Sequence, residues 1–220
     1  MVELRIERPD QLLRDRVTDT LRAAVLQGVF SPGDRLTERE LGELTGVSRT
    51  SLREGLRQLQ GEGLVEAAPG RGLRVTVLSE QELGELYEVR EYLESAAVEL
   101  FVQRATEEQI DALDRSLHSS SLPESKDDVR SGYYDNLFAG AGNPLLRKLY
   151  DSIAARIVMM QNLSIRTPGR AEETRREGEE LLGWIRKRDA PRAALAARHH
   201  VRMAKESALR ALQARLADSD

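Results

Sequence analysis

Apolar residues recur at steps of three and four positions along most of the chain, which is the spacing of one face of an α-helix. In the first part, this spacing predicts a helix over residues 10–28 and two more that begin at Thr37 and Ser48. Thr37 and Glu40 have the separation of a capping box, and Ser48 is a good N-cap. Gly46 tolerates a left-handed helix end, so the last two helices form a predicted helix-turn-helix.

The apolar positions also predict which helix faces are buried and where the helices give way to strands. The first helix of the pair has Leu41 and Leu44 on its apolar side, and the second has leucines at 52, 56 and 59. Residues 64–67 and 73–77 then predict two short strands around a Pro-Gly loop. A helix, a helix-turn-helix and a β-hairpin make a winged helix-turn-helix, which we expect over residues 1–78.

Residues 79–220 show helical spacing throughout and no internal repeat. A second capping box at Ser79 and Glu82 and a third at Thr106 and Gln109 mark helix starts. In the first of these helices, Val89 is among the residues expected to face the core. The predicted helices span 81–105, 106–119, 127–139, 143–165, 167–187 and 189–216. The fold class is therefore mainly α, with an N-terminal winged helix-turn-helix and a C-terminal six-helix antiparallel bundle.

A row of arginines marks the second helix of the helix-turn-helix. Arg49, Arg53 and Arg57 lie four positions apart and share one helix face beside the leucine face. Thr50 and Ser51, two short hydroxyl side chains, lie at the start of the same helix. Arginine forks onto guanine or phosphate, and short side chains allow close approach, so this arrangement is typical of a helix that reads the major groove. The alternative for an arginine row by itself is an ordinary solvated helix face.

Composition narrows the function further. The net charge is −4 over 220 residues, and residues 1–77 are neutral, so any DNA-binding surface depends on where the arginines lie. The chain has no cysteine, which excludes disulfides, thiolate metal sites and a cysteine nucleophile. It has no nucleophile motif and no glycine-rich phosphate loop, so we expect no enzyme. Without an apolar run of about 18 residues or an apolar signal region, it is expected to be cytoplasmic.

Segments 30–36, 38–41 and 46–54, together with Leu59, Gly63 and Leu64, form a pattern that covers nearly all of residues 10–77. In these segments the first half resembles the GntR family of bacterial transcription regulators. The resemblance implies a homodimer that binds double-stranded DNA at a palindromic operator. It places the DNA contacts on the motif's first helix, the recognition helix and the wing, at Arg39, Ser48, Arg49, Thr50, Ser51, Arg53, Gly70 and Arg71.

The second half resembles the all-helical, FCD-type effector domain of the FadR branch of this family. The matching segments are 86–94, 135–138, 142–146 and 188–190. Six helices suit the VanR-like subgroup. The resemblance implies that residues 79–220 dimerise and bind a small-molecule effector, and that the protein is a repressor.

Many members of this branch hold a divalent metal through Asp-x-x-Phe-His on one helix and a histidine on each of two later helices. Asp135 and Phe138 match this pattern, but Ala139 and Gly178 stand where histidines are expected. Only His200 occupies a histidine position. We therefore expect no tightly bound metal and no cofactor, with Asp135 and His200 as the residual candidates for a rebuilt site.

Alanine and glycine in place of two histidines enlarge the expected cavity and leave room for an organic effector, such as an organic acid. The polar groups that we place around it are Arg90, Asp135 and His200. The structural alternatives are that Arg90 pairs with Glu94 four positions along its helix, and that Asp135 is merely solvated.

The leading interpretation is a DNA-binding transcription regulator whose operator affinity is controlled by an effector. One alternative is a constitutive DNA-binding dimer with a vestigial effector site. Another is metal-dependent sensing by a rebuilt site. An enzyme in the helical half is the third class, and it lacks a supporting motif.

Overall fold

The computed structural model describes residues 11–70, 72–119, 126–164 and 169–217. The chain divides into two compact units, Met1–Val77 and Leu78–Asp220. None of the helices in those described stretches combines the length and the apolar character that a membrane crossing requires. Each unit is mainly helical, as the spacing of apolar residues predicts.

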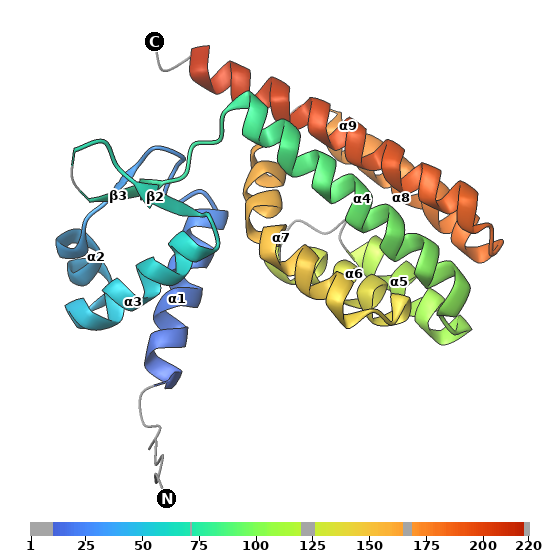
Figure 1. Ribbon diagram of the computed structural model, residues 1–220, viewed down its shortest axis with the longest axis horizontal. Helices are drawn as coiled ribbons and strands as arrows, with labels where there is room; N and C mark the ends of the chain where they lie inside the picture. Colours follow the sequence, from blue (N-terminus) through green and yellow to red (C-terminus); the bar gives the residue numbers. More distant parts are fainter. Residues whose placement is uncertain (1–10, 71, 120–125, 165–168, 218–220) are drawn as a thin grey trace, which may run out of the picture. The chain divides into compact units, whose positions relative to one another are not determined.

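The first unit is a helix-turn-helix with a small sheet (Figure 1). Helix α1 runs over Gln11–Leu26, α2 over Glu38–Thr45 and α3 over Arg49–Gly61. Both predicted N-caps are confirmed, because the Thr37 and Ser48 side chains accept hydrogen bonds from the third residue along. Gly46 ends α2 with a φ of 69°, a left-handed conformation that glycine adopts without strain.

The sheet contains one strand that the sequence pattern did not reveal. The predicted hairpin is present as β2 (Val65–Ala67) and β3 (Leu73–Val75), but a third strand, β1 (Arg35–Leu36), pairs antiparallel with β3. The order is β1-β3-β2. Two residues carry too little periodicity to predict a strand, so β1 is visible only through its pairing.

The leucine face of α3 packs against α1 and fixes the helix in place. Leu52, Leu56 and Leu59 are buried, as predicted. The two helices come close at Gly55, where an added Cβ would lie 3.3 Å from Val17. At the other end of α3, Arg22 of α1 forms two hydrogen bonds of 2.8 and 2.7 Å to Glu62. These contacts hold α3 along its inner face and leave its outer face available to a partner.

One predicted core position in α2 is wrong. Leu41 is buried, but Leu44 is 73% exposed. The half-buried position is Thr45, whose hydroxyl donates to the Leu41 carbonyl at 2.6 Å. Residues 41 and 45 lie about 40° apart around a helix, whereas residue 44 lies about 60° away on the other side of 41. The short helix faces the core along 41 and 45 and turns Leu44 outward.

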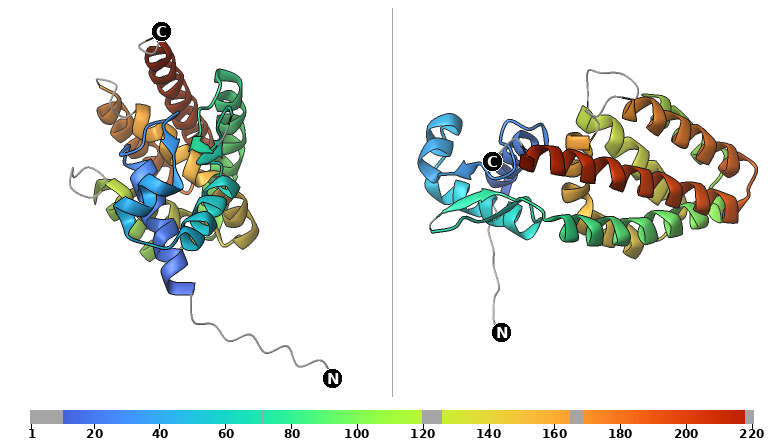
Figure 2. Two further views of the ribbon diagram at one scale, coloured as in Figure 1. Left: turned by 90° about the vertical axis from the view of Figure 1, so that its left-hand side faces the viewer. Right: turned by 90° about the horizontal axis from the view of Figure 1, so that it is seen from above.

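The second unit contains the six predicted helices within its described residues. They are α4 (Glu80–Arg104), α5 (Glu107–Ser119), α6 (Lys126–Ala141), α7 (Pro144–Ser164), α8 (Arg170–Arg186) and α9 (Ala190–Ala217). The two longest, α4 and α9, run side by side (Figures 1 and 2). Their cross-links place Glu80 beside Gln213 and Glu91 beside Arg202, so the two helices are antiparallel.

The helix starts in this unit follow the predicted caps wherever the structure describes them. Ser79 and Glu82 form a complete capping box, and Thr106 and Gln109 exchange the same two hydrogen bonds. Asp189 caps α9 by accepting from the backbone of Arg192. The start predicted at Thr167 and Pro168 falls outside the described residues, and α8 begins after Gly169.

Arg188 ties the α8–α9 turn to the end of α4. It has a φ of 55°, which is rare for a residue with a side chain. Its guanidinium donates to the carbonyls of Val102 and Ala105 at 3.0 and 2.7 Å and to Glu107 at 2.6 Å. These bonds satisfy carbonyl groups that the C-terminus of α4 leaves without helical partners.

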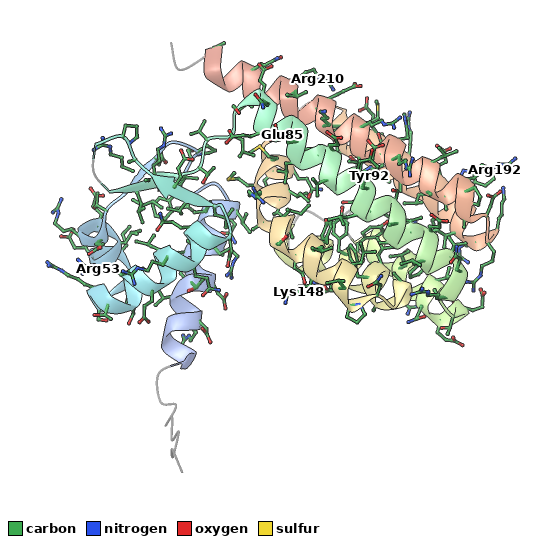
Figure 3. All side chains as sticks on the ribbon, in the orientation of Figure 1. Arg53, Glu85, Tyr92, Lys148, Arg192 and Arg210 are labelled. Atoms are coloured by element: carbon green, nitrogen blue, oxygen red, sulfur yellow. The ribbon has the colours of Figure 1, made fainter. Side chains whose placement is uncertain are left out.

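One predicted core residue of α4 is exposed. The buried face of this helix includes Leu83, Leu86 and Tyr87, whereas Val89 is 47% exposed. Tyr92, three positions further, is also exposed (Figure 3). The helix therefore has an inner apolar face and a second, outer apolar strip that the spacing alone merges into one.

Candidate DNA interface and buried polar cluster

The arginine row of α3 lies on an exposed face of the helix, beside its buried leucines. Arg49, Arg53 and Arg57 are all exposed. Figure 3 shows Arg53 projecting outward from the helix. Thr50 beside them is exposed as well, so the N-terminal half of α3 presents cations and a small hydroxyl together. The structure brings these predicted contact residues onto one accessible surface, as a major-groove reader requires.

Glu38, at the first position of α2, is a neighbour of this row that no sequence pattern predicted. Its carboxylate accepts a hydrogen bond of 2.7 Å from Nε of Arg53. The hydrogen bond from Arg53 is the main cause that lowers the pKa of Glu38, and the charge of Arg49 contributes. Fifteen residues separate the two partners, so helix periodicity could not pair them; the turn geometry does.

The serine side chains at the start of α3 have structural bonds of their own. Ser48 accepts from the Ser51 backbone at 3.2 Å, and the two hydroxyls lie 3.0 Å apart. Both therefore set the first turn of α3. Arg39 of α2 is 74% exposed and reaches Glu43 at only 3.5 Å, so its guanidinium is loosely held.

The wing has one predicted contact residue that the structure places and one that it does not. Gly70 is exposed and has a φ of 93°, which lets the chain turn at the tip. Arg71 lies outside the described residues. Behind the tip, Arg35 donates to the Pro69 carbonyl at 3.3 Å. This bond joins β1 to the wing loop, a link that the sequence did not predict.

In the helical unit, Arg90 of α4 lies at the centre of a buried polar cluster. Its side chain has no exposed area, and its Nε donates to Glu94 at 2.6 Å. Nη2 donates to the Tyr134 hydroxyl at 3.0 Å, and the Tyr87 ring lies 5.2 Å from the guanidinium carbon. The i to i+4 pairing of Arg90 with Glu94, the structural alternative for Arg90, is therefore present.

The Arg90 guanidinium does not use all of its donors. Nη1 of Arg90 is buried and donates to none of the residues that the structure describes. Glu94 also accepts from the hydroxyls of Tyr134 and Tyr150, at 2.9 and 3.3 Å. Burial is the main cause that raises the pKa of both tyrosines, so their hydroxyls stay protonated donors at neutral pH. An unsatisfied donor on a buried charge costs about 1–3 kcal/mol or more, so Nη1 is suited to an added acceptor.

Asp135 does not belong to this cluster. It is exposed and pairs with Arg147 of α7 at 2.6 Å, and Ala139, one helical turn later, is exposed too. The inner face of α6 runs instead through Tyr134, Leu137 and other apolar residues. Placing Asp135 around an internal cavity was therefore wrong by one position. The aromatic pair at 133 and 134, in register with the buried residues of α6, was the signal that identified the inner face.

His200 forms a separate cluster with residues of α8. Its Nδ1 lies 2.6 Å from Glu177, which also receives two hydrogen bonds, of 2.6 and 2.8 Å, from Arg170. Burial alone would raise the pKa of Glu177, but the bonds from His200 and Arg170 outweigh it and lower the pKa. The structure thus gives Arg90, Asp135 and His200 three different sets of partners.

The metal-site pattern does not converge in this arrangement. Among the described residues, no three His, Cys, Asp or Glu side chains gather as metal ligands would. The Glu177 carboxylate that pairs with His200 also pairs with the cation of Arg170, and this set of side chains does not fit a divalent ion. Gly178 does not enlarge a cavity either, because a Cβ there would lie 2.8 Å from Leu117. The Leu117 side chain fills the space beside this glycine, so the expected enlargement of the cavity is wrong.

The two halves match two family models. Residues 13–75 match the model described as bacterial regulatory proteins, gntR family, and residues 85–203 match the FCD domain. The uncharacterized HTH-type transcriptional regulator YdhC of Bacillus subtilis is 28% identical over 188 residues, which is 82% of each chain. The HTH-type transcriptional repressor GlaR of Escherichia coli is 26% identical over 196 residues, covering 82% of this chain and 89% of the repressor.

Solved structures show the same fold. A putative GntR transcriptional regulator from Rhodococcus sp. RHA1 superimposes with a TM-score of 0.75 at 20% identity, covering 90% of this chain and 98% of that one. At this identity the likeness extends to the arrangement of helices and strands and not to the residues of a site.

Proposed function

We propose that this chain, which belongs to the gntR family of bacterial regulatory proteins, carries an FCD domain and is a DNA-binding transcription regulator, acts as a homodimeric repressor. Its affinity for a palindromic operator changes when a small organic acid binds in the helical unit. The observation that carries the effector part is Arg90, a fully buried cation with one donor nitrogen that no described residue accepts.

For the DNA-binding part, α3 supplies the major-groove reader. The buried leucines hold the helix by one face, and Arg49, Arg53 and Thr50 point away from them. Arg39 extends this surface onto α2, and Gly70 lies at the wing tip that would meet the neighbouring backbone or minor groove. Ser48 and Ser51 contribute by holding the first turn of α3 in place. The backbone N–H groups of this turn also suit a phosphate.

For the dimer, the outer apolar strip of α4 supplies the contact surface. Val89 and Tyr92 on α4, and Leu145 and Leu149 on α7, are 47–67% exposed. The two helices pack against each other, and each of them exposes large apolar side chains. Large apolar side chains grouped in this way are typical of a protein interface. A second copy of the chain fits this surface because a short recognition helix reads too few base pairs to bind tightly alone, and a twofold dimer reads both half-sites.

For the effector, the cluster around Arg90 favours an anion. A carboxylate would accept from Nη1 of Arg90, and the protonated hydroxyls of Tyr134 and Tyr150 lie near the same cation. Charge-assisted hydrogen bonds of this kind are about twice as strong as neutral ones. The effector changes DNA affinity only by its differential affinity for the two arrangements of the dimer, and the buried cation gives it a strong contact to gain or lose. No metal ion is needed in this scheme.

A constitutive DNA-binding dimer is the second candidate, and two observations favour it. Arg90 already has an internal counter-charge in Glu94, and Leu117 fills the space beside Gly178. The helical unit would then be a dimerisation domain only. The repressor GlaR, which the chain resembles along most of its length, supports repression rather than activation in either case.

A ligand screen separates the two candidates. Thermal unfolding of the full chain is measured with a panel of mono- and dicarboxylates and sugar acids, with and without Zn²⁺ or Ni²⁺. Each stabilising compound is then tested for its effect on binding to a duplex that the protein selects from a random-sequence pool. The proposal expects a carboxylate that raises the melting temperature without metal and changes duplex affinity. A matched Arg90→Leu/Glu94→Leu variant should lose that response while it still binds the duplex. Absence of any response across the panel would favour the constitutive dimer.

A further inference from the structure

The surface of α3 that carries the arginine row also includes an acidic side chain. Glu38 contributes a negative charge where a DNA-binding surface would ordinarily exclude one, because phosphates repel a carboxylate. It is also less exposed than its partner, with 36% of its side chain accessible against 61% for Arg53. A carboxylate in this place requires a reason beyond solubility.

The bond between the two side chains is directional. Glu38 accepts at 2.7 Å from Nε of Arg53, and the two Nη groups of Arg53 donate to no residue that the structure describes. A guanidinium presents its donors in a rigid, planar fork, so fixing Nε fixes the plane and direction of both Nη groups. The carboxylate therefore holds the back of the guanidinium and leaves its outer end available.

The position of Glu38 is itself fixed by secondary structure. It is the first residue of α2, directly after the N-cap Thr37, and its charge favours that end of the helix. Its partner lies in the second turn of α3, whose start is set by Ser48. The turn between the two helices thus determines where the carboxylate meets the arginine.

We propose that Glu38 is a positioning residue that orients the Nη groups of Arg53 toward one base pair of the operator and thereby contributes to sequence discrimination. The proposal rests on the proposed function, because it requires that Arg53 meets DNA. Holding the fork in advance reduces the rotamer freedom that a long side chain loses on binding. The smaller loss of rotamer freedom strengthens binding mainly at the correct base pair, where a two-pronged contact forms. It strengthens phosphate contacts much less, because phosphates accept from many directions.

Two physical effects of removing the Glu38 charge have opposite signs. If Glu38 only repels phosphates, Glu38→Gln raises affinity for every duplex. If Glu38 positions Arg53, Glu38→Gln lowers affinity for the selected duplex about three- to tenfold, a fraction of the discrimination that a two-pronged arginine contact supplies. It also reduces the penalty for substituting the one base pair that Arg53 reads. Glu38→Asp, which keeps the charge but is shorter, should reduce that penalty as well.

The matched control is Glu54→Gln. Glu54 is an exposed acid on α3 itself, and the structure gives it no arginine partner among the described residues. Removing its charge should leave affinity unchanged or raise it about equally for all duplexes. Thermal unfolding of each variant checks that α2 and α3 remain folded.

The experiment is a fluorescence-anisotropy titration with the full chain. The probes are the duplex that the wild-type protein selects from a random pool and its single-base-pair variants. The decisive comparison repeats Glu38→Gln in the presence of Arg53→Ala. With Arg53 absent there is nothing to position, so removal of Glu38 should then raise affinity instead of lowering it.

Two results would overturn the inference, and they can be told apart. If Glu38→Gln strengthens binding to all duplexes as Glu54→Gln does, Glu38 is only a repulsive charge, and the DNA-binding role of Arg53 stands. If Arg53→Ala changes neither affinity nor discrimination, the docking of α3 is wrong, and the positioning role falls with it.

Discussion

Replacing Glu94 by leucine should destabilise the helical unit strongly, because Arg90 is held inside it by this carboxylate. Arg90 has no exposed area and relies on Glu94 for the anion at 2.6 Å from its Nε. The remaining hydrogen bond of its guanidinium goes to the neutral hydroxyl of Tyr134. Removing one partner of a buried ion pair costs about 3–5 kcal/mol, since the other charge stays buried without compensation.

Replacing both partners should cost much less. A pair of well-packed apolar side chains is often neutral or stabilising in place of a buried ion pair. The Arg90→Leu/Glu94→Leu protein still leaves two tyrosine hydroxyls without their acceptor, at roughly 1 kcal/mol each. We therefore expect the free energy of unfolding of this double variant to be about 2 kcal/mol lower than that of the wild type. It should still be higher than that of the Glu94→Leu protein. This order of stability is the signature of a buried pair.

Urea unfolding followed by tryptophan fluorescence measures this directly. The chain has a single tryptophan, Trp184, and it lies in α8 of the helical unit. Its signal therefore reports on the helical unit even where the first unit unfolds separately. If Glu94→Leu costs less than about 1 kcal/mol, or if the double variant is the least stable of the three, the buried pair is not as described.

The remaining predictions concern packing, pH and assembly. Gly140→Ala should destabilise the helical unit by about 1–3 kcal/mol or more, because its Cβ would lie 2.3 Å from the Phe101 ring. The control Gly183→Ala, with open space around it, should stabilise α8 by up to about 1 kcal/mol. Urea unfolding that finds the two variants equally stable would contradict this packing. The lowered pKa of Glu177 means that its contribution to stability is complete above the unfolded pKa of about 4.3 and is lost as the pH falls through the lower folded value. A Glu177→Gln protein should show a flatter fall in stability below pH 5, and an unchanged pH profile would exclude that role. Tyr92→Asp should convert the proposed dimer to a monomer in analytical ultracentrifugation, because it places a charge on the exposed apolar strip of α4. A dimer of unchanged affinity would place the interface elsewhere.

Local sequence signals predicted the helices, their caps and the arginine row, because each depends on residues within one or two turns. Ser79 and Glu82 form their capping box, and the leucine face of α3 is buried. Errors arose where two faces of one helix had to be distinguished. Leu44 and Val89 are apolar at helical spacing yet exposed, since spacing identifies apolar strips but not what covers them.

Two residues of the predicted effector site are placed differently from expectation for a related reason. Asp135 was placed by likeness to a motif, but α6 turns it outward to Arg147 and turns Tyr134 inward. Gly178 was interpreted as an enlarged cavity, and its space is taken by Leu117 from α5, sixty-one residues away. Contacts of this kind, like the pairing of Glu38 with Arg53, depend on how helices pack and not on local pattern.

The most direct test of the account is whether the arginine row of α3 binds DNA specifically. Full-length protein is titrated against the duplex that it selects from a random pool and against a scrambled duplex, and Arg49→Ala and Arg53→Ala are compared with Arg176→Ala. Arg176 is a similarly exposed arginine of α8, so its removal changes the net charge equally. We expect Arg49→Ala and Arg53→Ala each to weaken binding of the selected duplex by about tenfold to a hundredfold, while Arg176→Ala has little effect. Equal affinities for all four proteins, or no preference for the selected duplex, would contradict the central claim that α3 reads an operator.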